Sequence, residues 1–342
     1  PLPFRALFLI CFGIWAWGSN IQLLRWTGIE PSRLLLAPGK KILRHRSIYQ
    51  LAGAYSAVLA VGWLVFAATQ STLVIVFVYV GFFALTVNPV DSWWRHKRFC
   101  FLRSLGRIIF GGLASPVHLA DVVLADILTS FARVLADLYV VLCYVVTASS
   151  LDLAIHSLEQ STTCVYSWVG PVLVALPYML RLKQCLIEAA QSRDWPSRRR
   201  HLANALKYAS AFPVIILSAV QRLRSSDSIR AWENMFVCVL FNSFYSFYWD
   251  VAVDWQLGPL SLPLTPQWEV HARYLRPMLH FSEPSIYYLA IVLDFLLRFT
   301  WSLKLSTHLR LDELTAGGFV LEWLEVVRRW LWVYFRLERE WV

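Results

Sequence analysis

The sequence predicts an all-α fold, a polytopic bundle of transmembrane helices. Of its 342 residues, 58% are hydrophobic and 16% are charged, with a mean hydropathy of +0.51. A soluble domain carries about 25% charged residues, so this chain has too little polar surface to cover itself in water. The apolar residues form blocks of about 20, enough for a helix to cross a bilayer core of ~30 Å. The blocks do not alternate with period two and are too long for barrel strands, which leaves helices as the spans.

Nine apolar segments are predicted to span. In chain order they are 4–24, 48–69, 72–88, 117–149, 166–190, 201–222, 230–255, 284–308 and 317–338. A tenth segment, 97–116, is interrupted by Arg103 and Arg107. It either lies in the interface as an amphipathic helix or spans with both Arg side chains facing protein. The prediction is therefore a bundle of about ten helices.

Loop charge indicates the topology. The loop 149–165 has acidic but no basic side chains, whereas 193–200 is strongly basic. Because cytoplasmic loops collect Lys and Arg, the first is expected outside the cytoplasm and the second inside it. Counting the predicted spans forward from 193–200 places the C-terminus in the cytoplasm. The loop 25–47 is also basic and should be cytoplasmic, but the same span count puts it there only if 97–116 does not span. The side of the N-terminus therefore stays open.

Composition and motifs exclude several functions. The net charge of +10 would suit nucleic acid in a soluble chain, but not in one this apolar, so no nucleic-acid partner is expected. The six Cys lack C-x-x-C or zinc spacing and are interpreted as small apolar residues, with no metal site. G-x-S-x-G, HExxH and P-loop motifs are absent from the sequence, so we predict neither an enzyme nor a bound cofactor.

Ionisable side chains inside predicted spans are costly and usually functional. In 117–149, the spacing puts Asp126, Arg133 and Asp137 on one face of one helix. The simplest interpretation is that Arg133 and Asp137 neutralise each other at i, i+4, leaving Asp126 to another helix or to a substrate. Lys207, beside Tyr208, either snorkels to the interface or belongs to a site.

Two later segments carry further buried charge. In FYWDVAVDW, Asp250 is the better candidate for a buried acid, because Asp254 lies nearer the segment end and is expected to be solvated. Asp294 and Arg298 stand at i, i+4. Either the two side chains form an intrahelical clamp, or Arg298 faces a pore, with Trp301 one turn away from it.

The last segment has the strongest signal. Glu322, Glu325, Arg329 and Arg336 form a helical stripe, with Arg328 beside it. A cytoplasmic helix lying in the membrane plane would explain Arg336, but it explains the adjacent Arg328 and Arg329 less well. Clustered arginines inside a bundle make an anion site, and nearby acids hold them in place or bind cations.

These segments resemble the EXS-domain family, which includes the xenotropic and polytropic retrovirus receptor, plant phosphate exporters and the yeast ER-retention-defective Golgi protein. The resemblance is carried by LADVVLADILTS, LPYMLRLKQCL, HLANALKY, FYWDVAVDW, LRFTW and LEVVRRWLWVYFRLE. It runs over nearly the whole chain and is densest from about 117 to 340. It implies export of inorganic phosphate, with 1–116 as scaffold helices and 117–342 as the transport core.

The resemblance also implies which residues line the phosphate path. Trp301 resembles a gate. The predicted phosphate-binding and pore residues are Asp126, Thr129, Arg181, Asn204, Lys207, Tyr208, Asp250, Arg298, Glu325, Arg328 and Arg329. The chain departs from the animal members at Thr129, where they carry Asn, and at Ile187 and Glu188, where they carry two Arg.

The sequence contains no SPX-like stretch, which makes it most similar to the Golgi branch. That branch implies a multi-pass Golgi membrane protein that returns lumenal phosphate to the cytosol. The alternative, from a different class, is a sorting or retention factor for glycosyltransferases without transport activity. Inorganic phosphate and membrane lipid are the expected partners. A homodimer, Golgi glycosyltransferases and a coat adaptor stay open, as does an N-terminal segment trimmed before Pro1.

Overall fold

All regular elements in the described part of the chain are helical. The computed structural model describes residues 2–36, 43–90, 94–113, 115–147, 164, 167–224, 229–257, 275–276, 278–300 and 315–342. Its helices are α1 (Leu2–Trp26), α2 (Pro31–Leu35), α3 (His45–Thr69), α4 (Thr72–Val87), α5 (Arg95–Phe110), α6 (Leu119–Ser130), α7 (Ala132–Thr147), α10 (Val169–Gln191), α11 (Trp195–Ala209), α12 (Ala211–Arg224), α13 (Ile229–Tyr248), the π-helix η1 (Trp249–Asp254), α14 (Ser285–Arg298) and α15 (Thr315–Trp341).

Each of the nine predicted segments coincides with helix in the described residues, so the helical class is confirmed. In the part of the chain that the structure describes, four stretches are long and apolar enough to cross a membrane, namely 3–26, 45–69, 195–221 and 233–254, and Thr72–Val87 is a shorter apolar helix. The fold fits a helical membrane protein. The number of helices that cross the membrane stays a prediction.

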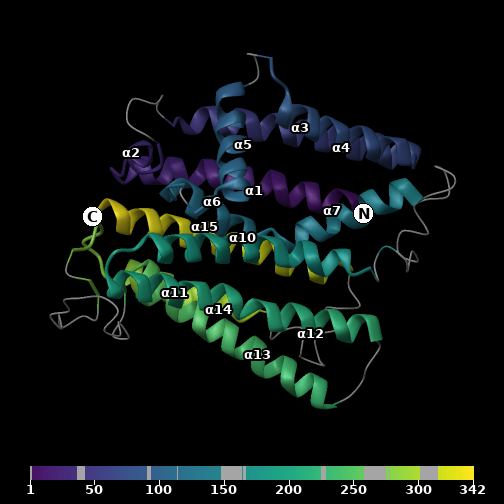
Figure 1. Ribbon diagram of the computed structural model, residues 1–342. Helices are drawn as coiled ribbons and strands as arrows, with labels where there is room; N and C mark the ends of the chain where they lie inside the picture. The colour runs from purple at the N-terminus through teal and green to yellow at the C-terminus, as the bar shows by residue number, and fades with distance from the viewer. Residues whose placement is uncertain are drawn as a thin grey trace.

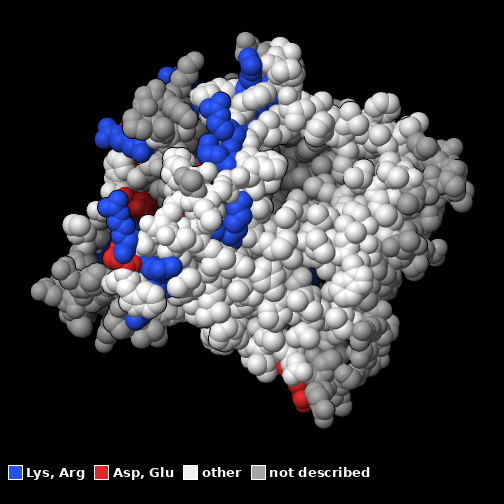
Figure 2. Space-filling model, in the orientation of Figure 1, with Lys and Arg blue, Asp and Glu red and all other residues white. Residues whose placement is uncertain are grey.

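Residues 97–110 of the ambiguous segment 97–116 lie in α5, which runs steeply across the long helices in Figure 1. Its 16 residues would reach only about 24 Å at 1.5 Å per residue. Arg103 is exposed, while Arg107 pairs with Asp121 at 2.6 Å. Figure 2 shows basic side chains gathered over α5 and the adjoining end of the molecule, with much of the same face uncharged. These features favour the interfacial helix over a tenth span.

Helices α3 and α4 pack closely at Gly62. A Cβ atom at this position would lie 2.1 Å from Cγ2 of Val78, closer than real atoms approach. Val is stiff at χ1, so the contact cannot be relieved by simple side-chain rotation. Gly62 therefore sets the distance between the two helices.

Replacing Gly62 with alanine is expected to destabilise the protein by about 1–3 kcal/mol, because it overpacks a filled interface. The matched control is Gly53→Ala in the same helix, where an added Cβ meets nothing within 4 Å. That control is expected to be neutral or slightly stabilising, since alanine is the better helix former. Thermal unfolding in detergent measures both. Equal melting temperatures for the two variants would contradict the close α3–α4 contact.

Three predicted spans are not continuous α-helices, which corrects the ranges 117–149, 201–222 and 230–255. The first breaks at Phe131, between α6 and α7, and the second at Ser210, between α11 and α12. The third turns into the π-helix η1. Pro213 accounts for the break at Ser210, because its ring clashes with the carbonyl four residues earlier. Irregular helix of this kind inside a bundle often marks a functional site.

A disulfide joins Cys143 near the end of α7 to Cys164. The interpretation of all six cysteines as small apolar residues is therefore wrong for these two. Disulfides persist in oxidising compartments. The bond agrees with the prediction that the loop 149–165, most of which lies outside the described residues, is non-cytoplasmic.

Candidate functional site

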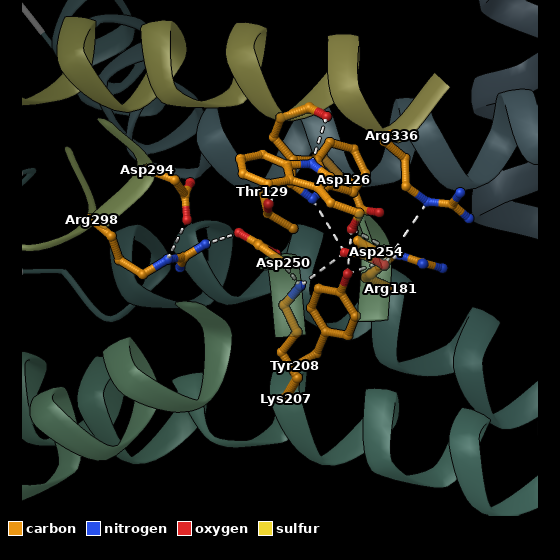
Figure 3. A network of polar contacts seen from close by, with 12 residues as sticks. Asp126, Thr129, Arg181, Lys207, Tyr208, Asp250, Asp254, Asp294, Arg298 and Arg336 are labelled. Carbon is orange, nitrogen blue, oxygen red and sulfur yellow. Dashed lines mark hydrogen bonds and ion pairs between the residues drawn. The ribbon is translucent and has the colours of Figure 1, made fainter. Parts of the chain in front are cut away.

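Charged side chains from α6, α10, α11, η1, α14 and α15, most of them buried, meet inside the bundle. Figure 3 shows those of Asp126, Arg181, Lys207, Asp250, Asp294 and Arg298. We call this group the ionic cluster. Its cations are Arg181, Lys207, Arg298, Arg328 and Arg329, and its acids are Asp126, Asp250, Asp294 and Glu325. Asp254, 3.6 Å from Lys207, adds a fifth carboxylate, so the five cations are balanced when all these groups are ionised. Among the described residues Arg329 binds hydroxyl groups rather than a carboxylate, which leaves its charge open to an anion.

Asp126 on α6 forms one part of the cluster. Its Oδ1 accepts from Arg181 Nε on α10 at 2.9 Å and from the hydroxyl of Tyr208 on α11. Arg181 also donates to Gln184 Oε1 at 3.1 Å, which fixes its guanidinium. Asp126 is only 2% exposed. A buried carboxylate needs partners, and Arg181 and Tyr208 supply them to this acid inside the bundle.

Asp250 on η1 is the centre of the cluster. It is fully buried, and its oxygens accept from Lys207 at 2.8 Å, from Arg328 at 3.1 Å and from Arg298. Lys207 is thus held inside the bundle and does not snorkel. Asp254 is 3.6 Å from Lys207, with its side chain only 14% exposed. The expectation that Asp254 is solvated is wrong, because η1 turns it inward.

Helix α15 supplies the two adjacent arginines. It packs against α1, α6 and α14, and Trp332 is fully buried, which excludes a helix lying on the surface. Arg328 binds Glu325 through two nitrogens, at 2.6 and 2.9 Å, and reaches Asp294 at 3.3 Å.

Arg329 is held differently, by hydroxyl groups. It donates to Ser130 Oγ at 3.0 Å and to Thr129 Oγ1 at 3.2 Å, and its guanidinium lies 4.8 Å from the centre of the Trp332 ring. Its Nη1 is buried and has no hydrogen-bond partner in the described part of the protein. A buried donor left in this way costs about 1–3 kcal/mol and calls for a ligand or water.

Most of the predicted pore residues come together here. Asp126, Thr129, Arg181, Lys207, Tyr208, Asp250, Arg298, Glu325, Arg328 and Arg329 lie in the ionic cluster or contact it. Asn204 is buried one turn before Lys207, but within the described ranges no hydrogen bond joins it to the cluster. Trp301 lies outside the described residues.

The intrahelical pair predicted for Arg133 and Asp137 is wrong. Asp137 accepts from Arg5 on α1 at 2.6 Å, and Arg133 is exposed. The break at Phe131 places Asp126 and Asp137 on separate helices, so they share no face.

The sequence prediction also missed Ser130, Gln184 and Trp332, and it left Asp294 out of the predicted site. Ser130 and Gln184 are uncharged, so intramembrane charge could not have revealed them. Asp294 did have a signal, because it stands one turn before Arg298.

The EXS family model matches residues 1–342, the whole of the chain. The chain belongs to the EXS family. The EXS chain is similar to Protein ERD1 homolog 1 of Schizosaccharomyces pombe, with 30% identity over 99% of this chain and 90% of that protein. It is 30% identical to the Xenotropic and polytropic retrovirus receptor 1 homolog of Danio rerio, over 98% of this chain and 49% of the relative.

Solute carrier family 53 member 1 of Homo sapiens is 27% identical, again over 98% of this chain and 49% of the relative. The EXS chain therefore spans about half the length of the receptor homolog and the solute carrier, but nearly all of the ERD1 homolog. The names of these relatives denote a receptor, a solute carrier and an ERD1 homolog, and none of the three denotes an enzyme.

Proposed function

We propose that this EXS protein transports inorganic phosphate across a membrane through the ionic cluster. The observation that carries the proposal is the buried Arg329, which in the described residues binds hydroxyl groups rather than a carboxylate and keeps an unmet N–H donor. Arginine binds oxyanions such as phosphate with its planar fork of donors. A phosphate oxygen would satisfy that donor and would supply the anion that Arg329 lacks among the described residues.

Each charged group has a role in this proposal. Arg298, Arg328 and Arg329 bind phosphate together with Lys207, and Asp250 holds three of these four cations before phosphate arrives. Phosphate then competes with carboxylates already in place. Competition keeps binding weak enough for release, which conduction requires.

The proposed location is the Golgi membrane, with the C-terminus in the cytosol. Figure 1 shows the C-terminus at the end of the bundle opposite the end of α7, which carries Cys143 of the disulfide. An oxidising lumen on the disulfide side would place the C-terminus in the cytosol. Every cluster residue lies within 117–342, which supports this range as the transport core and 1–116 as the scaffold.

The test is phosphate flux in proteoliposomes made with the purified chain. Saturable release of labelled phosphate, above that of protein-free liposomes, is the expected result. Flux no higher than in empty liposomes would overturn the proposal.

A retention factor for glycosyltransferases is the second candidate. It is favoured by the similarity to the ERD1 homolog over 90% of that protein, and by the ER-retention-defective Golgi protein in the resemblance. Expressing variants in cells that lack the protein separates the two functions. A variant without phosphate transport that still restores glycosyltransferase retention would favour the second candidate.

We expect Trp301 to gate the path, because it follows Arg298 by three residues and can cover an anion site. Trp301→Ala should then raise phosphate leak while leaving the melting temperature nearly unchanged. A packing tryptophan predicts the opposite, because its loss costs about 3–5 kcal/mol. Flux and thermal unfolding are measured on the same preparation. A large loss of stability without a gain in flux would reject the gate.

A further inference from the structure

We propose that Asp294 and Arg298 together recognise the hydroxyl group of phosphate, so that the site accepts hydrogen phosphate and rejects sulfate. This inference rests on the proposed phosphate transport and adds the basis of its specificity. The observation behind it is a neighbouring hydrogen-bond donor and acceptor in the ionic cluster that form no hydrogen bond with each other.

The two atoms are Nε of Arg298 and Oδ2 of Asp294, one turn apart on α14. They are 3.8 Å apart, which is too far for a hydrogen bond. Both atoms are buried, and neither has a hydrogen-bond partner in the part of the chain that the structure describes. Asp294 as a residue is fully buried. The intrahelical ion pair of the sequence alternative is therefore present, but without a hydrogen bond between these two atoms.

Contacts with other helices hold the side chains of Arg298 and Asp294 in these positions. Arg298 donates through Nη2 to Asp250 on η1, which draws its guanidinium away from Asp294. Asp294 accepts through Oδ1 from Arg328 on α15 at 3.3 Å. Because each side chain has a partner on a different element, relaxation of α14 alone does not close the pair.

A ligand that bonds to both atoms needs two different oxygens. One must accept from the Arg298 N–H, and its neighbour must be an O–H that donates to the carboxylate of Asp294. Hydrogen phosphate and dihydrogen phosphate carry both kinds of oxygen. Sulfate near neutral pH has acceptors only, as an ionised carboxylate does. Sulfate would leave Asp294 unsatisfied and would set two anionic oxygens against each other.

This arrangement discriminates by penalising the wrong anion. A site built to bond a substrate hydroxyl rejects the analogue that lacks it, because the buried partner is left without its bond. The cations Arg298 and Arg328 beside Asp294 argue against a metal ion at its free oxygen. Arsenate has the shape and the hydroxyl of phosphate, so the site should accept it.

The experiment measures competition in proteoliposomes containing the full chain and labelled phosphate. For the wild type, unlabelled arsenate should inhibit phosphate flux, and sulfate should inhibit about 10- to 100-fold less effectively than arsenate. Asp294→Asn replaces the acceptor by an amide that can donate to sulfate. Sulfate should become an effective inhibitor of that variant.

The matched control is Asp137→Asn, which alters an ion-paired carboxylate on α7 outside the cluster. It should keep the wild-type preference. Sulfate inhibition of the wild type as strong as that by arsenate would overturn the inference, whether or not Asp294→Asn folds. An unchanged preference in a folded Asp294→Asn protein would overturn it too. The absence of any phosphate flux in the wild type would instead reject the proposed function itself.

Discussion

Replacing Arg329 with alanine is expected to weaken phosphate transport about 10- to 100-fold. The substitution removes charge-assisted hydrogen bonds, each worth about 1.5–3 kcal/mol, and every 1.4 kcal/mol is about tenfold in affinity. It also removes the cluster cation that binds hydroxyl groups rather than a carboxylate in the described residues. Flux at subsaturating phosphate, measured in proteoliposomes, reports the loss.

The Arg329→Ala protein should still fold. Ser130, one of the two hydroxyl partners, also donates to Glu325 at 2.7 Å, and Thr129 donates to the Asp126 carbonyl at 2.7 Å. Neither hydroxyl is therefore left without a partner. The control is Arg33→Ala, which removes an arginine whose side chain is 74% exposed. Normal flux in the folded Arg329→Ala variant would show that the assigned site is wrong. Arg329→Lys, which keeps the charge but loses the fork, should be intermediate.

The largest loss of stability is expected for Glu338→Ala, about 3–5 kcal/mol, because it breaks a buried ion pair and leaves one charge behind. Glu338 is fully buried and binds Arg276. It also accepts from the backbone N–H of His280 at 3.1 Å and from the Tyr287 hydroxyl at 2.9 Å. All three donors lose this acceptor in the variant.

Phosphate transport should fall together with stability. Arg276 also donates to the carbonyl of Trp255 at 2.9 Å, directly after η1. It therefore helps to hold the π-helix that presents Asp250 to the cluster. If Arg276 loses Glu338 and becomes less well held, the position of Asp250 should change, although Arg276 does not contact Asp250.

The control for this prediction is Glu340→Ala, two residues later on α15. The Glu340 side chain is 29% exposed and pairs with Arg336 and Arg339, so its loss should cost no more than about 1 kcal/mol. Denaturant or thermal unfolding in detergent compares the two variants. Equal destabilisation would contradict a special role for the buried pair. Replacing both Arg276 and Glu338 with apolar residues should recover part of the stability.

Local patterns in the sequence predicted the helices well. Segment length and hydropathy determine whether a stretch can span a bilayer, and both can be read without knowing the neighbours. The break at Ser210 also had a local cause in Pro213. The π-helix at 249–254 had no local cause that the hydropathy pattern could reveal, because this helix depends on how its side chains pack.

Pairing between charges could not be read locally. The i, i+4 rule paired Arg133 with Asp137, whereas Asp137 binds Arg5, 132 residues away in the chain. The partners of Asp250 are 43, 48 and 78 residues away, on three other helices. Distances of this kind exist only after the helices have packed.

The sequence by itself determined the helical membrane class, the segment positions and the charges too costly to face lipid. The tertiary structure decided which of those charges meet, that Cys143 binds Cys164, and that Asp294 and Arg298 pair without a hydrogen bond between Oδ2 and Nε. The reason is physical. The cost of burying a charge belongs to the residue and its segment, whereas the interaction that offsets it belongs to two side chains that only the packed bundle brings together.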